Sequence, residues 1–326
     1  MYGSLGRIEL GGSLGALGTA EGDAALTLDL ARPVAAKNAD GTTRAPRSGI
    51  LAGVRASQLT SALFSNAGFA HAFFTRKGGV SKPPFDTLNF AYSTGDERAS
   101  VEENVARAGA VLGVDPSRIY YLHQVHGVGV QVLDGSAARE AVRRLSGDVT
   151  ASSTAGVACG VQTADCVPVL LADRESGAVA AVHSGWKGTV ANAARAGVAA
   201  LRALTGREGS LVAAVGPHIE PCCFEVGHDV AEQLAACSLA GGDVIDVSRN
   251  KPHVDLRRIV EAQLREAGVR EVDHVRGCTH CDAERFHSYR RDGKVGGRML
   301  AAVVARENAS EPRIERICQP ISDSRD

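Results

Sequence analysis

The chain has few aromatic residues and almost no excess charge. Phe, Trp and Tyr together make up 4% of its 326 residues, and the formal net charge is −1. Proteins that bind single-stranded nucleic acid stack bases on aromatic rings, and a basic surplus attracts both nucleic acid and anionic membrane surfaces. The composition therefore gives no reason to expect nucleic acid or a membrane as a partner.

Long apolar runs are also missing. No stretch of about 18 apolar residues occurs, so we expect no transmembrane helix. The N-terminus lacks a basic segment followed by an apolar one, and four early glycines interrupt it, so we expect no secretory signal: Gly3, Gly6, Gly11 and Gly12. The eight cysteines are accordingly predicted to be reduced thiols of a cytoplasmic protein, some of them acting as ligands.

Composition divides the chain near residue 55. Residues 1–55 are rich in Gly and Ala and contain one clearly alternating run, Ala25–Leu30. They are predicted to form an N-terminal extension, with a strand or hairpin that docks on the rest. Residues 56–326 are predicted to form one catalytic domain. Its length is ample for a buried core.

From Phe69 onward, short β-like runs alternate with amphipathic helical segments. This order predicts a single α/β (α+β) domain built in layers, with mixed sheets. The expected strands are 70–75, 129–133, 158–163, 167–172, 178–182, 211–215, 244–247 and 272–275. The expected helices are 101–112, 189–204, 229–236 and 255–267.

Three residues at the ends of apolar runs suggest a metal site. Cys166 precedes the run that begins at Val167, and Pro168 indicates that a strand starts there. His183 ends another run, and His126 follows a third. Two imidazoles and one thiolate form a three-ligand zinc site with an open fourth position, which is typical of a catalytic metal. Taken alone, each could instead be a buried thiol or a histidine with ordinary hydrogen bonds.

A second candidate metal site combines two cysteine pairs. Cys278 and Cys281 have the two-residue spacing of zinc ligands, and Cys222 and Cys223 could complete a closed tetrahedral site. The latter pair is adjacent, however, without the usual spacer, and the glycines of a zinc knuckle are absent. The sequence leaves a structural zinc site open as the less favoured interpretation of these cysteines.

Basic residues beside glycines form two further candidate sites. Arg76 and Lys77 precede Gly78-Gly79, where backbone N–H groups can approach a phosphate. Tyr289, Arg290 and Arg291 lie in a basic segment that is followed by Gly296-Gly297-Arg298. Such a segment suits an oxyanion or ribose hydroxyl groups, although solvated surface charge is the more common explanation of paired arginines.

Several short motifs together resemble the bacterial laccase-domain family, which includes polyphenol oxidases, purine nucleoside phosphorylases and peptidoglycan editing factors. Their order and approximate spacing hold from about residue 69 to residue 303. The motifs are Phe73-Phe74-Thr75-Arg76, Gly78-Gly79-Val80-Ser81, Leu88-Asn89, Gln124-Val125-His126-Gly127, Thr163-Ala164-Asp165-Cys166, His183-Ser184-Gly185-Trp186, Gly216-Pro217-His218-Ile219, Phe224-Glu225-Val226-Gly227, Cys278-Thr279 and Ser288-Tyr289-Arg290-Arg291.

The resemblance implies a layered α-β-β-α fold and a zinc ion held by His126, Cys166 and His183. It also implies phosphorolysis of adenosine and inosine to the free base and ribose 1-phosphate. Adenosine deamination and methylthioadenosine phosphorolysis are implied as related reactions, and copper is a less favoured metal. The expected partners are a nucleoside and phosphate, and we expect a monomer or a small homo-oligomer.

The predicted catalytic residues are His126, Cys166, His183 and Arg76. The predicted substrate- and phosphate-binding residues are Asn89, Lys187, Tyr289, Arg290 and Arg291, and His123 or His287 is the expected general acid. The chain departs from the family pattern at Lys187, which stands where arginine is usual and cannot form a bidentate fork. It also departs at His287, in place of phenylalanine, and at Cys281.

Two other enzyme classes and one non-enzymatic function stay open. A copper phenol oxidase normally needs several copper ions and many clustered histidines, whereas the ten histidines here are widely spread. A cysteine hydrolase or amidase that edits a peptidoglycan precursor would use Cys166 as nucleophile and His183 or His126 as base. A non-enzymatic binding module in which zinc only stabilises the fold would need a fourth protein ligand to the ion.

Overall fold

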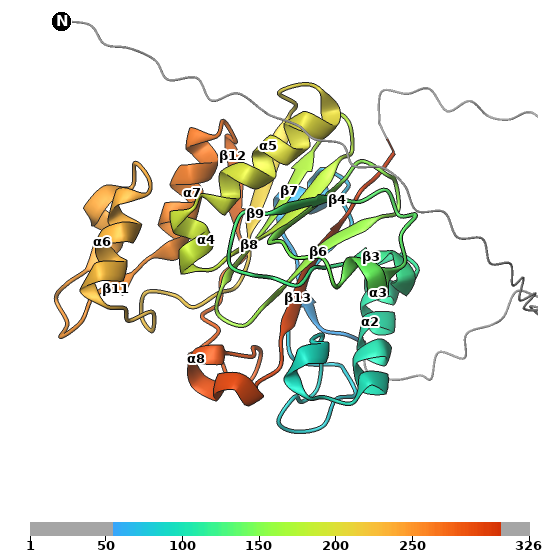
Figure 1. Cartoon of the computed structure of the whole chain (residues 1–326), viewed down its shortest axis with the longest axis horizontal. Helices are drawn as coiled ribbons and strands as arrows, with labels where there is room; N and C mark the ends of the chain where they lie inside the picture. Colours follow the sequence, from blue (N-terminus) through green and yellow to red (C-terminus); the bar gives the residue numbers. More distant parts are fainter. Residues whose placement is uncertain (1–54, 308–326) are drawn as a thin grey trace, which may run out of the picture. The chain divides into compact units, whose positions relative to one another are not determined.

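The computed structural model describes residues 55–307 of the chain. All but the last residue of the predicted N-terminal extension therefore lies outside the described residues. Two β-sheets occupy the centre of the described unit, and helices lie on both sides of them (Figure 1). None of the helices in this part of the chain is long and apolar enough to cross a membrane.

One sheet has five strands in the order β1-β2-β13-β6-β3. Only the β3–β6 pair is parallel. The strands are β1 (Gln58–Leu59), β2 (His71–Phe74), β3 (Ile119–Tyr120), β6 (Ala158–Thr163) and β13 (Met299–Val304).

The other sheet has six strands in the order β12-β9-β7-β8-β5-β4. Its two outer pairs are parallel and its inner pairs are antiparallel. The strands are β4 (Val130–Val132), β5 (Val149–Ser152), β7 (Val167–Asp173), β8 (Val179–Ser184), β9 (Leu211–Val215) and β12 (Glu271–His274). Both sheets are thus mixed, as predicted.

Helices cover the outer faces of the two sheets. Figure 1 shows α4, α5 and α7 on one side of the sheets and α2 on the other. The helices are α1 (Ala62–Asn66), α2 (Arg98–Leu112), α3 (Arg139–Val142), α4 (Trp186–Val190), α5 (Ala193–Thr205), α6 (His228–Ala236), α7 (Leu256–Glu266) and α8 (Tyr289–Asp292). The short 3-10 helices are η1 (Tyr92–Thr94), η2 (Pro116–Arg118), η3 (Gly241–Val244) and η4 (Gly293–Val295). Apart from the two large sheets, β10 (Ile245–Asp246) and β11 (His253–Val254) form an antiparallel pair.

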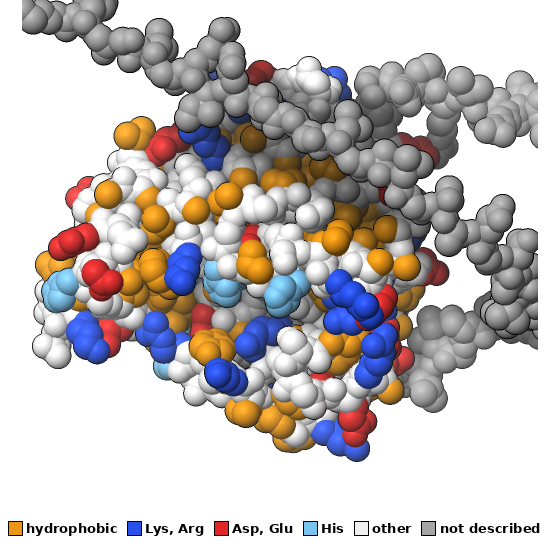
Figure 2. Space-filling view, viewed as in Figure 1, with side chains coloured by type: hydrophobic (Ala, Val, Ile, Leu, Met, Phe, Trp, Pro, Cys, Tyr) orange, Lys and Arg blue, Asp and Glu red, His pale blue; other side chains and the backbone are white. Residues whose placement is uncertain are grey.

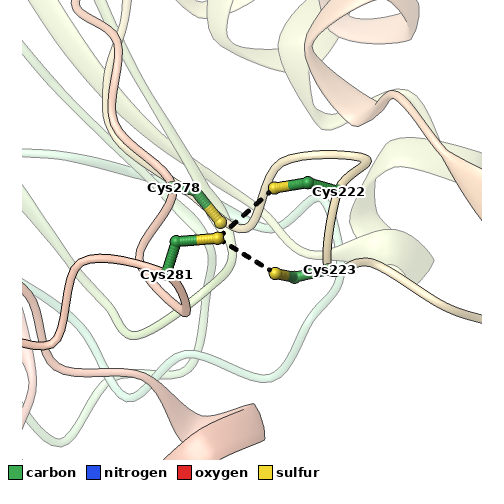
Figure 3. A group of neighbouring side chains, drawn as sticks. All are labelled: Cys222, Cys223, Cys278 and Cys281. Atoms are coloured by element: carbon green, nitrogen blue, oxygen red, sulfur yellow. Dashed lines mark hydrogen bonds between the residues drawn. The ribbon is translucent and has the colours of Figure 1, made fainter.

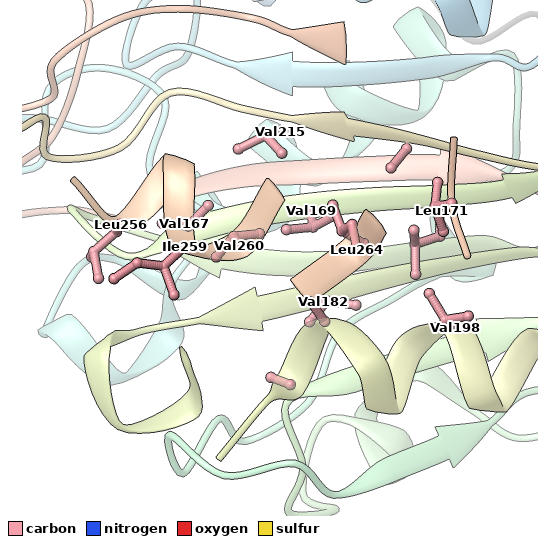
Figure 4. Close-up of a cluster of buried hydrophobic side chains, with 14 of the residues drawn as sticks. Val167, Val169, Leu171, Val182, Val198, Val215, Leu256, Ile259, Val260 and Leu264 are labelled. Carbon is pink, nitrogen blue, oxygen red and sulfur yellow. The ribbon is translucent and has the colours of Figure 1, made fainter. Parts of the chain in front are cut away.

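Alternating side chains on the strands produce three separate cores. Val169 and Leu171 of β7 pack against α5 and α7, as Figure 4 shows. Leu170 lies on the opposite face and packs between the two sheets, together with Val161 of β6. The outer face of the five-stranded sheet packs against α2 through residues such as Leu300. Since successive strand residues point to opposite faces, two fully buried sheets require apolar runs without alternation, and these runs are what the sequence contains. The result is the expected α-β-β-α layering.

Two local features differ from the sequence-based expectation. The segment 189–204 is not one helix, because Asn192 adopts a left-handed conformation with φ of 61° and separates α4 from α5. Its side chain then caps α5 by accepting a hydrogen bond from the backbone N–H of Arg195 at 3.1 Å. In addition, five strands and three short helices were not predicted, although one of them, β13, lies at the centre of its sheet. These elements are β1, β3, β5, β11, β13, α1, α3 and α8.

Candidate metal and substrate site

The side chains of His126, Cys166 and His183 converge on one point. Their ligand atoms all lie within 4.8 Å of one another, and Cys166 Sγ is 3.8 Å from His126 Nε2. The two imidazole rings meet edge to face, with 4.8 Å between centroids. Zn–S and Zn–N bonds at a tetrahedral centre place sulfur and nitrogen about 3.6 Å apart. The distance from Cys166 Sγ to His126 Nε2 is close to this value, and the other two donor separations do not exceed 4.8 Å.

Strand pairing brings two of these residues together. Cys166 immediately precedes β7, and His183 is the penultimate residue of β8. The antiparallel register pairs Pro168 with His183, so the start of β7 lies beside the end of β8. Gly185 follows β8, and a Cβ at this position would lie 2.7 Å from His126 Cδ2 and 3.0 Å from Cys166 Sγ. The absence of a side chain at Gly185 thus leaves room for two of the three donors.

Asp148, which the sequence analysis did not identify, orients both histidines. Its fully buried carboxylate accepts hydrogen bonds from His183 Nδ1 at 2.8 Å and from the backbone N–H groups of His126 at 2.9 Å and Gly127 at 2.7 Å. Burial by itself would raise the pKa of Asp148, but the bonds from His183 and Gly127 hold that pKa below its usual value. Because Nδ1 of His183 is used by Asp148, Nε2 is left to bind a metal.

The thiol and the imidazole shift each other's pKa. Burial would raise the pKa of Cys166, but the charge of His183 and the hydrogen bond to His126 lower it to about 6. Burial would lower the pKa of His183, but Cys166 and Asp148 raise it to about 9. Cys166 is therefore a thiolate near neutral pH, the form that binds metals and attacks electrophiles.

The three residues lie in the wall of a cavity of about 710 Å³. Figure 2 shows histidine side chains near the middle of the face in view, with lysine and arginine side chains around them. Apolar and aromatic side chains provide further lining, among them Trp186, Ile219, Phe224 and Tyr289. A cavity lined by apolar and aromatic side chains, basic groups and side chains that could hold a metal ion can accommodate a planar ligand that carries an anion.

Three cations line the cavity, each from a different segment. Lys187 lies in α4, with Nζ 5.6 Å from the ring centroid of Trp186. Arg290 lies in α8, over the ring of Phe224 at 5.7 Å. Arg298 precedes β13, lies over Tyr289 at 5.5 Å, and donates to the carbonyl oxygens of Gly296 and Gly297. Arg298 was not among the predicted site residues, although the Gly296-Gly297-Arg298 run was noted beside the basic segment.

Three predicted site residues, one of them predicted to be catalytic and two to bind substrate or phosphate, are not in the cavity lining and are bonded elsewhere. Arg76 forms an ion pair with Asp86 at 3.2 Å and donates to the carbonyl oxygen of Ala283. Arg291 donates to the carbonyl oxygens of Thr279, His280 and Phe286. Asn89 is fully buried and accepts from the backbone N–H of Arg298 at 2.8 Å. The first two connect loops, whereas Asn89 positions a residue that does line the cavity.

The two candidate general acids differ in their surroundings. His123 lines the cavity and is exposed. His287 is fully buried outside the lining, and burial together with the positive charge of Arg76 lowers its pKa to about 3. An imidazole with this pKa is not an imidazolium near neutral pH, and His287 lies outside the lining, so His123 is the better placed of the two candidates.

Residues 70–306 match the protein family described as multi-copper polyphenol oxidoreductase laccase. The chain belongs to this laccase family. A purine nucleoside phosphorylase of Streptomyces coelicolor is 40% identical over 228 residues, which cover 70% of this chain and 92% of the relative. A purine nucleoside phosphorylase of Deinococcus radiodurans is 40% identical over 238 residues, which cover 73% and 90%. The purine nucleoside phosphorylase YfiH of Escherichia coli is 36% identical over 236 residues, which cover 72% and 93%.

Solved structures of the laccase family have the same fold. YlmD from Geobacillus stearothermophilus is 29% identical, with a TM-score of 0.69 over 78% of this chain and 100% of that one. The YfiH protein of Bacillus licheniformis is 27% identical, with a TM-score of 0.68 over 73% and 92%. The family and the layered fold inferred from the short motifs are thereby confirmed.

Proposed function

We propose that this protein is a zinc-dependent purine nucleoside phosphorylase that acts on adenosine and inosine. The observation that carries the proposal is the cavity itself, in which the His126, Cys166 and His183 donors lie in one wall together with three cations and several aromatic rings. The names of the relatives at 36–40% identity support the same reaction.

The donor set supports zinc as the metal. Cysteine and histidine are borderline-to-soft ligands that suit zinc, and three protein ligands leave a position for a reactant. A bound zinc ion would supply Lewis acidity, polarising a coordinated group and lowering the pKa of a coordinated water. Copper oxidase chemistry has less support, because only two side-chain groups within residues 55–307 could hold a metal, and one of them contains no histidine.

In phosphorolysis, an oxygen of inorganic phosphate forms a bond to C1′ of the ribose while the bond from C1′ to the purine nitrogen breaks. The electron pair leaves with the purine, which must gain a proton. Lys187, Arg290 and Arg298 are the cations available to hold phosphate, and guanidinium groups offer paired donors to its oxygens. His123 is the proposed proton donor to the departing base. The rings of Trp186 and Tyr289 offer faces for the purine.

Adenosine deamination is proposed as a second reaction of the same site. Water replaces the amino group at C6, and ammonia and inosine are the products. Methylthioadenosine phosphorolysis uses the same bond changes at C1′ as adenosine phosphorolysis. The two reaction types differ in their requirement for phosphate, which makes them separable by experiment.

The test is incubation of the purified full chain with adenosine, with and without phosphate, while adenine, inosine and hypoxanthine are measured separately. Adenine should form only with phosphate, inosine should form without it, and hypoxanthine should follow from inosine when phosphate is present. Zinc removal should abolish all three. Base release without phosphate, or full activity after zinc removal, contradicts the proposal.

A cysteine hydrolase is the second candidate, favoured by one specific observation. Cys166, His183 and Asp148 are linked in the order nucleophile, base and orienting carboxylate, and the thiol is ionised near neutral pH. Such an enzyme would act on an amide of a cell-wall precursor. Trapping of an acyl group on Cys166 in metal-free protein supports this candidate, and its absence together with zinc-dependent nucleoside cleavage rejects it.

A further inference from the structure

Four cysteines outside the cavity converge on a second point. Figure 3 shows the sulfur atoms of Cys222, Cys223, Cys278 and Cys281 directed toward one another. All four Sγ atoms lie within 4.8 Å of one another, with 3.5 Å between Cys222 and Cys281 and 3.2 Å between Cys223 and Cys281. Cysteines that serve only as small apolar side chains have no reason to gather their sulfur atoms in this way.

The fold explains why these residues meet. Strands β9 and β12 are parallel neighbours, so the loops that follow them leave the same edge of the sheet. The two loops are joined by hydrogen bonds from the backbone N–H of His218 to the carbonyl of Gly277 at 3.2 Å and from Thr279 to His218 at 3.0 Å. One loop carries the adjacent cysteine pair, and the other carries the pair separated by two residues.

The distances fit a tetrahedral ion. Four sulfur atoms, each about 2.3 Å from a zinc ion, are about 3.8 Å apart. The observed separations of 3.2 and 3.5 Å are close to this value, and both are well above the length of a disulfide bond, about 2.0 Å. Cys222 and Cys223 are adjacent in sequence and lack the usual two-residue spacer. Both of their sulfur atoms nevertheless lie close to Cys281 Sγ, so the pair meets the same distance requirement.

Positive groups lie beside the cluster. Arg249 donates to the carbonyl oxygen of Cys222 at 3.1 Å, and Arg290 donates to that of Cys223 at 3.4 Å. Four thiols that bind one zinc ion release their protons to solvent, and the resulting centre carries a net charge of about −2. Two guanidinium groups near the cysteine backbone would offset this charge.

We propose that Cys222, Cys223, Cys278 and Cys281 hold a second zinc ion in a closed structural site. This ion joins the loop after β9 to the loop after β12. The first loop contributes Ile219 and Phe224 to the cavity wall. In the second loop, the Thr279 hydroxyl donates to Asp165 at 2.6 Å, next to the Cys166 ligand. The second ion therefore stabilises the wall of the first site without contacting the reactants.

The inference is independent of the reaction at the first site, and its test measures metal content. Elemental analysis and native mass spectrometry of the full chain should find about two zinc ions, and about one each in Cys281→Ser and Cys166→Ala. The two variants should differ in their remaining properties. Cys281→Ser should unfold at a lower temperature and keep the cavity metal, whereas Cys166→Ala should keep the cysteine-bound ion. Cys237→Ser, at a cysteine outside both groups, is the matched control and should keep both ions.

Three outcomes overturn the proposal. One is a single zinc ion in the unmodified protein that is lost in Cys166→Ala and retained in Cys281→Ser. Another is a mass that shows a disulfide within the cluster in place of an ion. The third is a cobalt-substituted protein whose thiolate-to-cobalt absorption is unchanged by Cys281→Ser. Because the disulfide mass is measured on the unmodified protein, the proposal can be overturned even if a variant does not fold.

Discussion

Asp148 connects His126 and His183, the two histidines proposed as metal ligands, through a single carboxylate. It receives the Nδ1–H of His183 and the backbone N–H groups that shape the loop of His126. Replacement Asp148→Asn keeps one acceptor oxygen but removes the charge that fixes the imidazole. We expect zinc affinity and activity to fall by about 10- to 100-fold, which is the usual effect of losing a carboxylate behind a metal-bound histidine.

Competition with a chromogenic chelator measures the affinity of the Asp148→Asn variant. Asp134→Asn is the control, since Asp134 is exposed and bonds only within its own turn, to Ser136. Equal affinity in the wild type and Asp148→Asn would show that the carboxylate does not orient His183.

Gly185 and Gly188 lie close to the side chains proposed to hold the metal, and alanine substitutions at the two positions form a matched pair. A Cβ on Gly185 would lie 2.7 Å from His126 Cδ2, whereas the nearest atom to a Cβ on Gly188 is a carbonyl oxygen at 3.4 Å. Gly185→Ala should therefore displace ligands and lower kcat/KM by roughly 100-fold, the effect expected of a displacement of about 1 Å. Gly188→Ala, inside α4, should retain nearly full activity. Similar kinetics for the two variants would contradict this explanation of Gly185.

For single residues, the sequence predicts some members of the site but not others, because one residue type can have many roles. Cys166, His183 and His126 could be proposed from sequence because side chains of types that bind metals lie directly before or after apolar runs. Asp148 could not, because an aspartate before a short strand has many roles and its partner lies 35 residues away. Arg76 and Arg298 look alike in sequence, and only the position of Asp86 shows which of them is already paired.

Three segments around the cavity contribute one cation each, so the effect of each cation on phosphate binding can be measured separately. Lys187 comes from α4, Arg290 from α8 and Arg298 from the segment before β13. Loss of a hydrogen bond to a charged group costs about 1.5–3 kcal/mol, or roughly 10- to 100-fold. Lys187→Ala and Arg290→Ala should raise the KM for phosphate by about this factor while the KM for the nucleoside changes less.

Initial rates at varied phosphate and fixed adenosine test these variants. Lys294→Ala, an exposed lysine in η4 outside the cavity lining, is the control for general charge. If the KM for phosphate is unchanged in both cavity variants, neither Lys187 nor Arg290 binds the anion, and Arg298 is the remaining cation of the lining that could bind it.

Local sequence signals account for most of the elements but not for their boundaries. The buried strands β6, β7, β8 and β9 were predicted because both faces of each strand are covered, so each is an uninterrupted apolar run. Strand β5 was missed because Thr150 and Ser152 are polar, yet both are buried and bonded to carbonyl oxygens, of Gly160 and Leu133. The break at Asn192 depends on a backbone conformation that its neighbours in sequence do not reveal.

At the scale of the whole molecule, burial of neutral histidines links stability to pH. Burial lowers the pKa of His71, His218 and His287, the last to about 3. In the unfolded chain a histidine has a pKa of about 6.5, so the unfolded state binds more protons than the folded state below this pH. The stability that His287 contributes is therefore complete above pH 6.5 and is lost as the pH falls toward 3.

This linkage predicts how steeply the free energy of unfolding changes with pH. Between about pH 6 and pH 4, the free energy of unfolding should fall by about 1.4 kcal/mol per pH unit more in the wild type than in His287→Leu. Denaturant unfolding in the presence of a chelator isolates this effect from metal release. His228→Leu, at an exposed position, should keep the wild-type slope. If His287→Leu also keeps that slope, His287 is protonated in the folded protein, and the buried site must then contain an acceptor for the added proton.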